Sequence, residues 1–398
     1  MNSHQSDNRP DRFDLSRRGW LRTAGFAFAS GLWTGPAALR FAARAGTDDD
    51  DRGLIVRSLR PLDLETPVSG LGEFLTPNDR FFVRSHFGAP VEGLPWTVRV
   101  GGLVGERLGL GVEDLGRFER VTLPAVLQCS GNGRAKYRPV VPGVVWDRGA
   151  VGHAEWSGVR LADVLKAAKP DGAAAHVHFL GADGPPAPKT PAFLRSLPIA
   201  RALDPSTILA TSMNGEPLPH LHGGPVRLVV PTWTGNHWMK WVREITVSRD
   251  EAPGFYQQTG YKMPKTPTPP GTAPAPSDLI PVTTLNVKSL ITSPADGSKA
   301  RRGSVEVRGV AWTGDGHVTG VEVSTDRDRA WRAAALLDDP RPGSWRRWRL
   351  TLDGLAEGPN VLMARATDSN GQSQPEATPW NRSGYLWNGI DRVTISVG

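Results

Sequence analysis

The chain contains a single cysteine, Cys129, at the end of a short apolar run that breaks at once into a glycine-rich segment, "AVLQCSGNGR". Gly131 and Gly133 permit a tight turn of the backbone, and Arg134 places a permanent positive charge shortly after the sulfur. A thiolate close to an arginine has a lowered pKa and acts as a nucleophile or as a ligand for a soft metal. A buried, inert thiol is the ordinary alternative, and this segment alone favours it.

Basic residues gather in two other segments, "TPNDRFFVRSHFG" and "PLPHLHGGPVRLVVPTWTGNHWMKWV". In the first, Arg84 and His86 are two residues apart, which predicts that both project to one side of a strand. In the second, His222, Arg227 and Lys240 flank a buried strand. Arginine, lysine and histidine that converge at strand ends are typical of a site for a phosphate or another oxyanion.

Zinc and covalent haem are the other cofactors that these residue types suggest. His220, His222 and His237 have a spacing that fits no metal-binding helix, and no carboxylate lies beside them, so zinc is disfavoured. One cysteine excludes an internal disulfide, a zinc cluster of the CxxC type and the CxxCH attachment of haem. Because a chain of 398 residues buries an ample core, fold stability gives no reason for the thiol.

The elements that must position these residues follow from hydrophobic periodicity. Leu161, Val164, Leu165 and Ala168 recur at helical spacing, and Pro170 ends that pattern, which predicts a helix. The runs "WTVRVGGLV", "VHFLGA" and "PVRLVVPTW" indicate strands around it. Near the C-terminus, "SVEVRGVAW", "VTGVEVSTD", "WRRWRLTLDG", "NVLMARATD" and "DRVTISVG" alternate apolar and polar residues, which predicts a β-sandwich. The expected fold class is α+β followed by that sandwich.

Four segments are expected along the chain. We predict a leader over 1–45, a mixed α/β catalytic domain over 46–262, a proline-rich connector over 263–281 and the β-sandwich over 282–398. The leader carries "SRRGWLR", an apolar stretch and "AARAG", which together are typical of a twin-arginine export signal. It predicts a periplasmic protein, exported folded with its cofactor.

Charge and hydropathy exclude two classes of partner. The net charge is +7, but the leader's seven arginines and three aspartates account for +4 of it. The remaining +3 is too little to indicate nucleic acid. No run of 18 apolar residues is present, so we expect no membrane span in the mature protein.

Seven segments, from about residue 70 to the C-terminus, carry a resemblance to a known family. They are "FFVRSHFG", "VLQCSGNGR", "GVVWDRGAVGHAEWSGVRLADVL", "LGADG", "RSLPIARALDP", "MNGEPLPHLHGGPVRLVVPTWTGNHWMKWV" and "VKSLITSP". The chain resembles the sulfite oxidase family of molybdenum enzymes, and is most similar to its periplasmic bacterial sulfite dehydrogenases. That resemblance implies a molybdopterin-binding domain followed by an immunoglobulin-like sandwich that forms a homodimer.

The resemblance also implies roles for individual residues. Cys129 matches the protein ligand to molybdenum, whose other sulfurs come from a pyranopterin dithiolene. Positions that match cofactor contacts are Arg84, His86, Asp183, His222, Arg227 and Lys240. Arg134 and Arg84 would face sulfite, which would leave as sulfate after oxygen-atom transfer. Because the chain has no haem or iron-sulfur motif, the resemblance implies an external c-type cytochrome as electron acceptor.

Two positions depart from the family pattern. Phe193 stands where the family has a tyrosine in the substrate pocket, and Tyr137 is a candidate for supplying the missing hydroxyl. Ser383, preceded by Arg382, stands where the animal enzymes carry an arginine. Phe193 leaves open a subunit of a thiosulfate-oxidising complex that acts on carrier-bound sulfur, because that branch of the family shares the same motifs. A sulfoxide reductase, which would lack the sandwich, and a non-catalytic periplasmic binding protein are the remaining alternatives.

Overall fold

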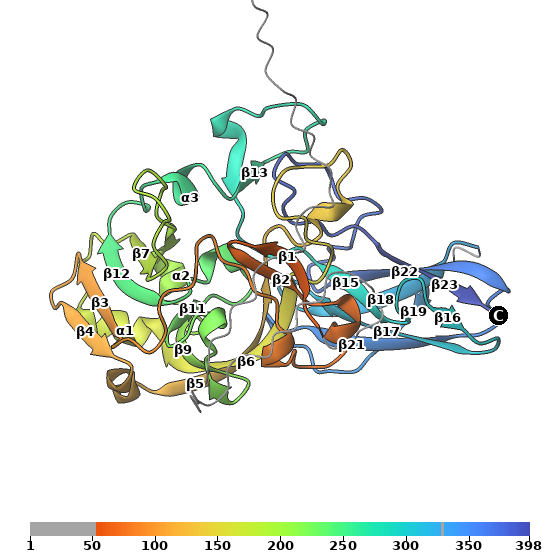
Figure 1. Cartoon of the computed structure of the whole chain (residues 1–398), viewed down its shortest axis with the longest axis horizontal. Coiled ribbons are helices and arrows are strands. Elements are labelled where there is room, and N and C mark those ends of the chain that lie inside the picture. Colours follow the sequence, from red (N-terminus) through yellow and green to blue (C-terminus); the bar gives the residue numbers. More distant parts are fainter. Residues whose placement is uncertain (1–52, 328–329) are drawn as a thin grey trace, which may run out of the picture. The chain divides into compact units, whose positions relative to one another are not determined.

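The computed structural model describes residues 53–327 and 330–398 (Figure 1). The twin-arginine leader predicted for 1–45 lies outside the described residues. No helix among those described is both long and apolar enough to cross a bilayer. A short hairpin, β1 (Ile55–Leu59) and β2 (Leu62–Glu65), opens the described chain.

Two five-stranded sheets build the first part of the protein, as the sequence predicts for a mixed α+β domain (Figure 1). One runs in the order β10-β9-β6-β5, with β11 also paired to β9, and all its pairs are antiparallel. The other runs β4-β3-β12-β7-β8, and only β12 and β3 are parallel. The first sheet contains β5 (Arg120–Gln128), β6 (Val151–Arg160), β9 (Ile208–Met213), β10 (Glu216–Pro217) and β11 (Arg227–Val229). The second contains β3 (Thr97–Gly102), β4 (Leu108–Gly111), β7 (His176–Gly181), β8 (Leu194–Pro198) and β12 (Val242–Ser248).

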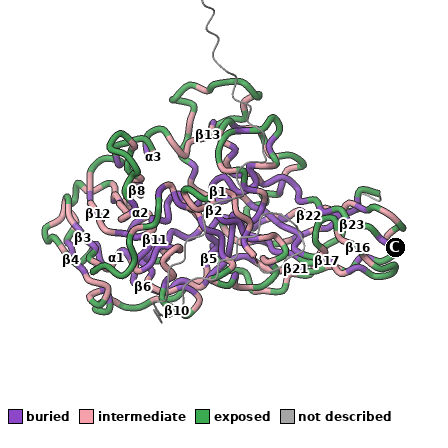
Figure 2. The backbone as a smooth tube through the Cα atoms, in the orientation of Figure 1, coloured by how far each residue is buried: buried purple, intermediate pink, exposed green. Residues whose placement is uncertain are grey.

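Strand β5 leads the chain from the surface to the cysteine. Its first residues are exposed or half-buried and its last four, ending at Gln128, are buried, so Cys129 follows a strand that runs inward (Figure 2).

The helix predicted from periodicity is present as α1 (Leu161–Ala168), whose four periodic apolar residues face the common core of the two sheets and are fully buried. The remaining helices are short. They are α2 (Ile199–Ala202), α3 (Phe255–Gln258) and the 3₁₀ helices η1 (Val68–Leu71), η2 (Asn78–Arg80), η3 (Glu113–Arg117), η4 (Arg134–Lys136), η5 (His220–His222), η6 (Gly235–His237) and η7 (Pro276–Asp278).

The proline-rich segment after residue 262 is largely exposed, yet it folds back on itself. β13 (Lys262–Pro264) pairs with β14 (Leu279–Pro281) in an antiparallel ladder.

The C-terminal sandwich consists of two sheets with the strand orders β15-β17-β21-β20 and β16-β23-β22-β18-β19. Its strands are β15 (Lys288–Ser293), β16 (Lys299–Ala300), β17 (Val305–Trp312), β18 (Val318–Thr325), β19 (Arg332–Ala333), β20 (Ala335–Leu336), β21 (Arg346–Leu352), β22 (Gly358–Asp368) and β23 (Asp391–Val397). The five strands predicted from alternation are all present.

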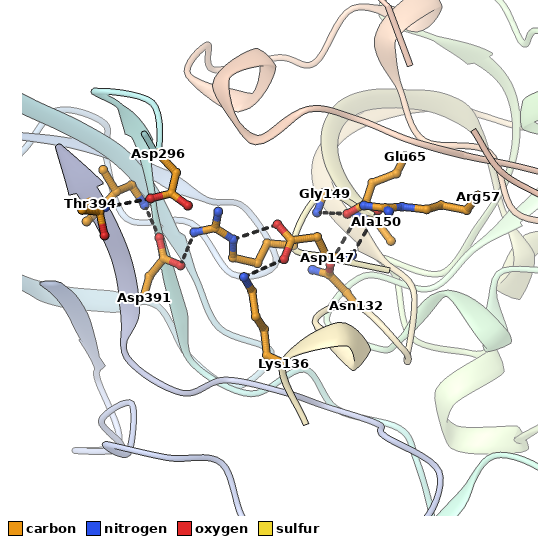
Figure 3. Close-up of polar contacts among 12 residues, drawn as sticks. Arg57, Glu65, Asn132, Lys136, Asp147, Gly149, Ala150, Asp296, Asp391 and Thr394 are labelled. Atoms are coloured by element: carbon orange, nitrogen blue, oxygen red, sulfur yellow. Dashed lines mark hydrogen bonds and ion pairs between the residues drawn. The ribbon is translucent and has the colours of Figure 1, made fainter. Parts of the chain in front are cut away.

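Polar contacts join the sandwich to the first part of the protein (Figure 3). The buried Arg148 binds Asp391, the first residue of β23, at 2.7 Å. Within the first part, Asp147 binds Arg148 at 3.1 Å and the exposed Lys136 at 2.8 Å. Trp312 donates its indole N–H to the Gln128 side chain at 3.0 Å. The residue before the cysteine is therefore anchored to the sandwich.

Lys288, at the start of β15, is a buried lysine whose charged form has no hydrogen-bond partner. Its side chain is 1% exposed, and its ammonium lies 4.7 Å from the Trp387 ring centroid with no hydrogen-bond partner. Burial lowers the pKa of Lys288 to about 7, against the opposing pull of the Asp391 carboxylate. The charged form therefore destabilises the fold at neutral pH and below.

We expect Lys288→Met to raise the free energy of unfolding at pH 6 by about 1–3 kcal/mol. The unfolded lysine keeps its proton up to about pH 10.4, whereas the folded one releases it near 7. Stability of the wild type therefore rises with pH across that window, and the advantage of the variant shrinks. Urea unfolding of both proteins at pH 6 and pH 9 measures this, with Lys299→Met as the exposed control. An advantage of equal size at both pH values would contradict the assignment.

Candidate active site

A cavity with an empty volume of about 700 Å³ opens where strands of both sheets end. Eight of the nine residues singled out from the sequence line it: Arg84, His86, Cys129, Asp183, Phe193, His222, Arg227 and Lys240. Cys129 follows β5, Asp183 follows β7, and Arg227 begins β11.

Arg84 and His86 reach the cavity from an extended segment. The strand predicted for them is wrong, because only Val83 makes a bridge, with Leu64, and the chain leaves the ladder after it. Arg84 binds the buried Asp63 carboxylate at 3.1 Å, and its other terminal nitrogen lies 3.3 Å from His86 Nδ1. Burial, reinforced by the charge of Arg84, lowers the pKa of His86 to about 3, so this imidazole is neutral.

Two buried cations in the cavity have no carboxylate partner. Arg227 is 3% exposed, donates to the carbonyl oxygens of His222 and Trp238, and keeps Nε without a partner. Lys240 donates to Ser85 Oγ at 2.6 Å and to a carbonyl oxygen. Burial lowers the pKa of Arg227 to about 9, and burial together with the charge of Arg227 lowers that of Lys240 to about 7.

Such a cluster is costly unless an anion joins it. The Asn236 amide nitrogen, also in the cavity, is a further buried donor without a partner. Unpaired donors, and positive charge that the Asp183 carboxylate offsets only in part, together fit the phosphate and polar ring edge of an anionic cofactor. Asp183 is the acidic group on the same wall, and burial raises its pKa to about 6.

Cys129 offers the soft donor of the site. It is partly exposed toward the cavity, and its backbone N–H donates to Ala150 O at 2.9 Å. Burial raises the pKa of the thiol, whereas the charges of Arg84 and Arg134 favour the thiolate. Within residues 53–327 and 330–398 no group of three or more His, Cys, Asp or Glu side chains is placed to hold a metal ion. A metal here would therefore take its remaining ligands from a cofactor, which suits a thiophilic metal.

Arg134 lies outside the cavity lining and is held by backbone oxygens. Its Nε donates to Ser383 O at 3.1 Å and one terminal nitrogen to Val144 O at 2.9 Å, while the guanidinium lies 5.5 Å from the Tyr385 ring centroid. Three glycines make room for it, because a Cβ at Gly131, Gly143 or Gly384 would stand less than about 3 Å from its side chain. Carbonyl oxygens orient the arginine without neutralising it, so its charge acts on the thiol side of the site.

The hydroxyl groups of Tyr137 and Tyr261 do not lie where the sequence led us to expect a hydroxyl for the substrate. Tyr137 donates to Tyr385 O at 2.6 Å and accepts from Asn381, and it does not line the cavity. The proposal that it replaces the hydroxyl missing at Phe193 is therefore wrong. Tyr261 does line the cavity, and sequence reasoning missed it. Its only signal was rarity, since the chain has four tyrosines.

The other residues considered from the sequence are used elsewhere. The three histidines weighed for zinc do not converge, because His220, His222 and His237 bond to the carbonyl oxygens of Pro90, Asn78 and Val282. Arg382 is exposed, and Ser383 contributes only the carbonyl oxygen that holds Arg134.

The half-buried Cys129 thiol faces cations without carboxylate partners at the ends of two sheets, and this arrangement fits a molybdopterin cofactor. Residues 86–256 match the family model of the oxidoreductase molybdopterin binding domain, and residues 280–398 match that of the Mo-co oxidoreductase dimerisation domain. The chain belongs to the sulfite oxidase family of molybdenum enzymes. The alternative of a non-catalytic binding protein is therefore excluded.

Four relatives illustrate the match. The chain is 37% identical to sulfite oxidase of Gallus gallus, over 86% of this chain and 78% of that protein. It is 31% identical to sulfite oxidase of Arabidopsis thaliana, over 87% of this chain and 94% of the other. The sulfane dehydrogenase SoxCD from Paracoccus pantotrophus superposes with a TM-score of 0.73 at 30% identity, covering 84% of each chain. The chain spans 66% of the longer mitochondrial sulfite oxidase of Mus musculus.

Proposed function

We propose that the protein is a periplasmic, molybdenum-dependent sulfite dehydrogenase that oxidises sulfite to sulfate and passes electrons to an external c-type cytochrome. The observation that carries this proposal is the positive charge around Cys129, where Arg84 and the carbonyl-held Arg134 both act on the thiol side of the cavity. A small dianion is the substrate that such charge attracts. Relatives named sulfite oxidase at 37% identity support the same substrate.

The residues of the chain divide into a holding group and a substrate group. Arg227, Lys240 and His222 would hold the cofactor phosphate and pterin edge, and Cys129 would ligate molybdenum. The bound cofactor supplies the oxygen-atom transfer and accepts two electrons. Arg84, in the cavity wall, neutralises and orients the dianion, and Phe193 excludes water from one wall. Arg134 adds its positive charge from outside the lining. The sandwich would form the homodimer that its family's name describes.

The cellular location and the electron acceptor are proposed from the amino-acid sequence and not from the cavity. The leader of 1–45 supports twin-arginine export to the periplasm. The single cysteine and the absence of a CxxCH motif support an electron acceptor on a separate protein.

A second candidate is oxidation of sulfane sulfur bound to a carrier protein. It is favoured by the likeness to the sulfane dehydrogenase SoxCD and by the apolar side chain of Phe193 in the cavity wall. The lack of a second guanidinium beside Arg134, where Ser383 offers only its carbonyl oxygen, points the same way. A bulkier substrate of lower charge would use such a site.

The deciding experiment measures molybdenum content and cytochrome c reduction by the purified protein. We expect about one molybdenum per chain, with reduction that depends on free sulfite. Addition of a persulfidated carrier protein without sulfite is the matched comparison. Reduction only with the carrier would replace the first proposal by the second, and a protein that binds no molybdenum would overturn both.

A further inference from the structure

Tyr261 places a hydroxyl in the cavity from a tightly held position. The residue lies between α3 and β13 and adopts a positive φ of 52°, a conformation that a tyrosine seldom takes. Its ring stacks on Tyr385 with centroids 5.6 Å apart, and the Arg195 guanidinium lies 5.4 Å from its centroid. These contacts fix the hydroxyl 2.5 Å from His86 Nε2.

The direction of the hydrogen bonds follows from the chemistry of the three partners. Arg84 can only donate, so His86 Nδ1, 3.3 Å from its guanidinium, must accept. The neutral imidazole then carries its hydrogen on Nε2 and donates it to the Tyr261 oxygen. Tyr261 keeps its own proton, because burial raises its pKa. Among the described residues the Tyr261 hydroxyl bonds to His86, from which it accepts, so its own proton is free for a ligand in the cavity.

Phe193 lies beside this hydroxyl. Its ring centroid is 6.3 Å from that of Tyr261 and 4.5 Å from that of His86. The wall of the cavity is thus apolar at position 193. The hydroxyl of Tyr261 lies in the same wall, and the Tyr261 ring is next to the Phe193 ring. The donor has the right chemistry for an oxygen of a sulfur oxyanion, because a phenol donates strongly to an anion and carries no charge itself.

We propose that Tyr261 donates a hydrogen bond to an oxygen of the bound sulfur oxyanion, and so supplies the hydroxyl that Phe193 cannot. This inference rests on the proposed function for the identity of the oxyanion. His86 acts as a positioning residue, since it orients the Tyr261 hydroxyl through Nε2 and is itself oriented by Arg84.

The test compares Tyr261→Phe with wild type in the molybdenum-loaded enzyme. Sulfate affinity, measured by calorimetry, is expected to fall about tenfold, as for the loss of one hydrogen bond to a charged group. Molybdenum content should stay equal, and kcat/KM for sulfite should fall by a similar factor. The double variant Tyr261→Phe with Phe193→Tyr is expected to recover most of the sulfate affinity, because the neighbouring ring then carries the hydroxyl.

Tyr256→Phe is the matched control. The Tyr256 ring packs against the same neighbours, with its centroid 4.6 Å from that of His86 and 5.0 Å from that of Phe193. Tyr256 does not line the cavity. Unchanged sulfate affinity in Tyr261→Phe would overturn the proposal, and so would a loss that Phe193→Tyr does not restore. Failure of the wild type to oxidise sulfite would overturn the proposed function instead, and the sulfate affinities would still decide the role of Tyr261.

Discussion

Cys129→Ser is expected to abolish sulfite oxidation. The serine oxygen is a hard, weakly acidic donor, whereas the cavity offers the thiolate as its soft ligand. Loss of a hydrogen bond to a metal ligand already costs about 10–100-fold in metal affinity or activity, so loss of the ligand itself should cost more than about 100-fold. Stopped-flow or steady-state cytochrome c reduction, with sulfite as donor, measures the effect.

The serine variant must be shown to fold and to load. Serine is close in size to cysteine, and the backbone N–H of residue 129 keeps its bond to Ala150 O, so we expect an unchanged melting temperature. Arg227 and Lys240 remain, so the pterin should still bind. Ser157→Ala, which removes a buried hydroxyl on β6 that does not line the cavity, is the control. A Cys129→Ser protein with full sulfite oxidation would remove Cys129 as the ligand.

Arg134→Gln is expected to lower kcat/KM for sulfite by about 30-fold, the equivalent of about 2 kcal/mol for the loss of a buried charge that attracts the dianion. Glutamine can still donate to one of the two carbonyl oxygens that hold the arginine, so the local fold should persist. The charge that favours the Cys129 thiolate and attracts the dianion is lost. Steady-state kinetics over a range of sulfite concentrations measures the change.

Arg138→Gln is the comparison for that variant. Arg138 is exposed, lies one turn further along and bonds only to backbone oxygens of Ala135 and Tyr137, so its loss removes an equal charge without touching the site. A drop of the same size in both variants would mean that sulfite responds to the general charge of the surface. A change below about threefold in Arg134→Gln would exclude the arginine from substrate binding.

The elements around the site were predictable because their patterns are local. The helix at Leu161–Ala168 and the strand that ends before Cys129 are read from the spacing of apolar residues within one element. Convergence of Cys129, Arg227 and Lys240 on one cavity was predictable only through the family resemblance, because strand ends meet according to topology and not according to sequence.

The parts that escaped prediction depend on backbone groups or on distant neighbours. Arg134 is oriented by the carbonyl oxygen of Ser383, 249 residues further along, and a carbonyl oxygen leaves no mark on the sequence. Arg84 and His86 share a face without belonging to a strand, because the segment leaves the ladder after Val83. Tyr261 could not be preferred over Tyr137, since only the cavity tells the two hydroxyls apart.

The loop that precedes the last strand belongs to the sandwich, yet it closes the chemical centre. Ser383 O holds Arg134, Tyr385 lies against its guanidinium, and the Trp387 ring stands where a Cβ on Gly133 would be. All described residues fall in one compact unit. In this chain, exchange of the sandwich would therefore release Arg134 from its anchor, so the two parts depend on each other for the geometry of the site. A substitution in this loop, near the C-terminus and outside the cavity lining, would then change the affinity for substrate by moving Arg134.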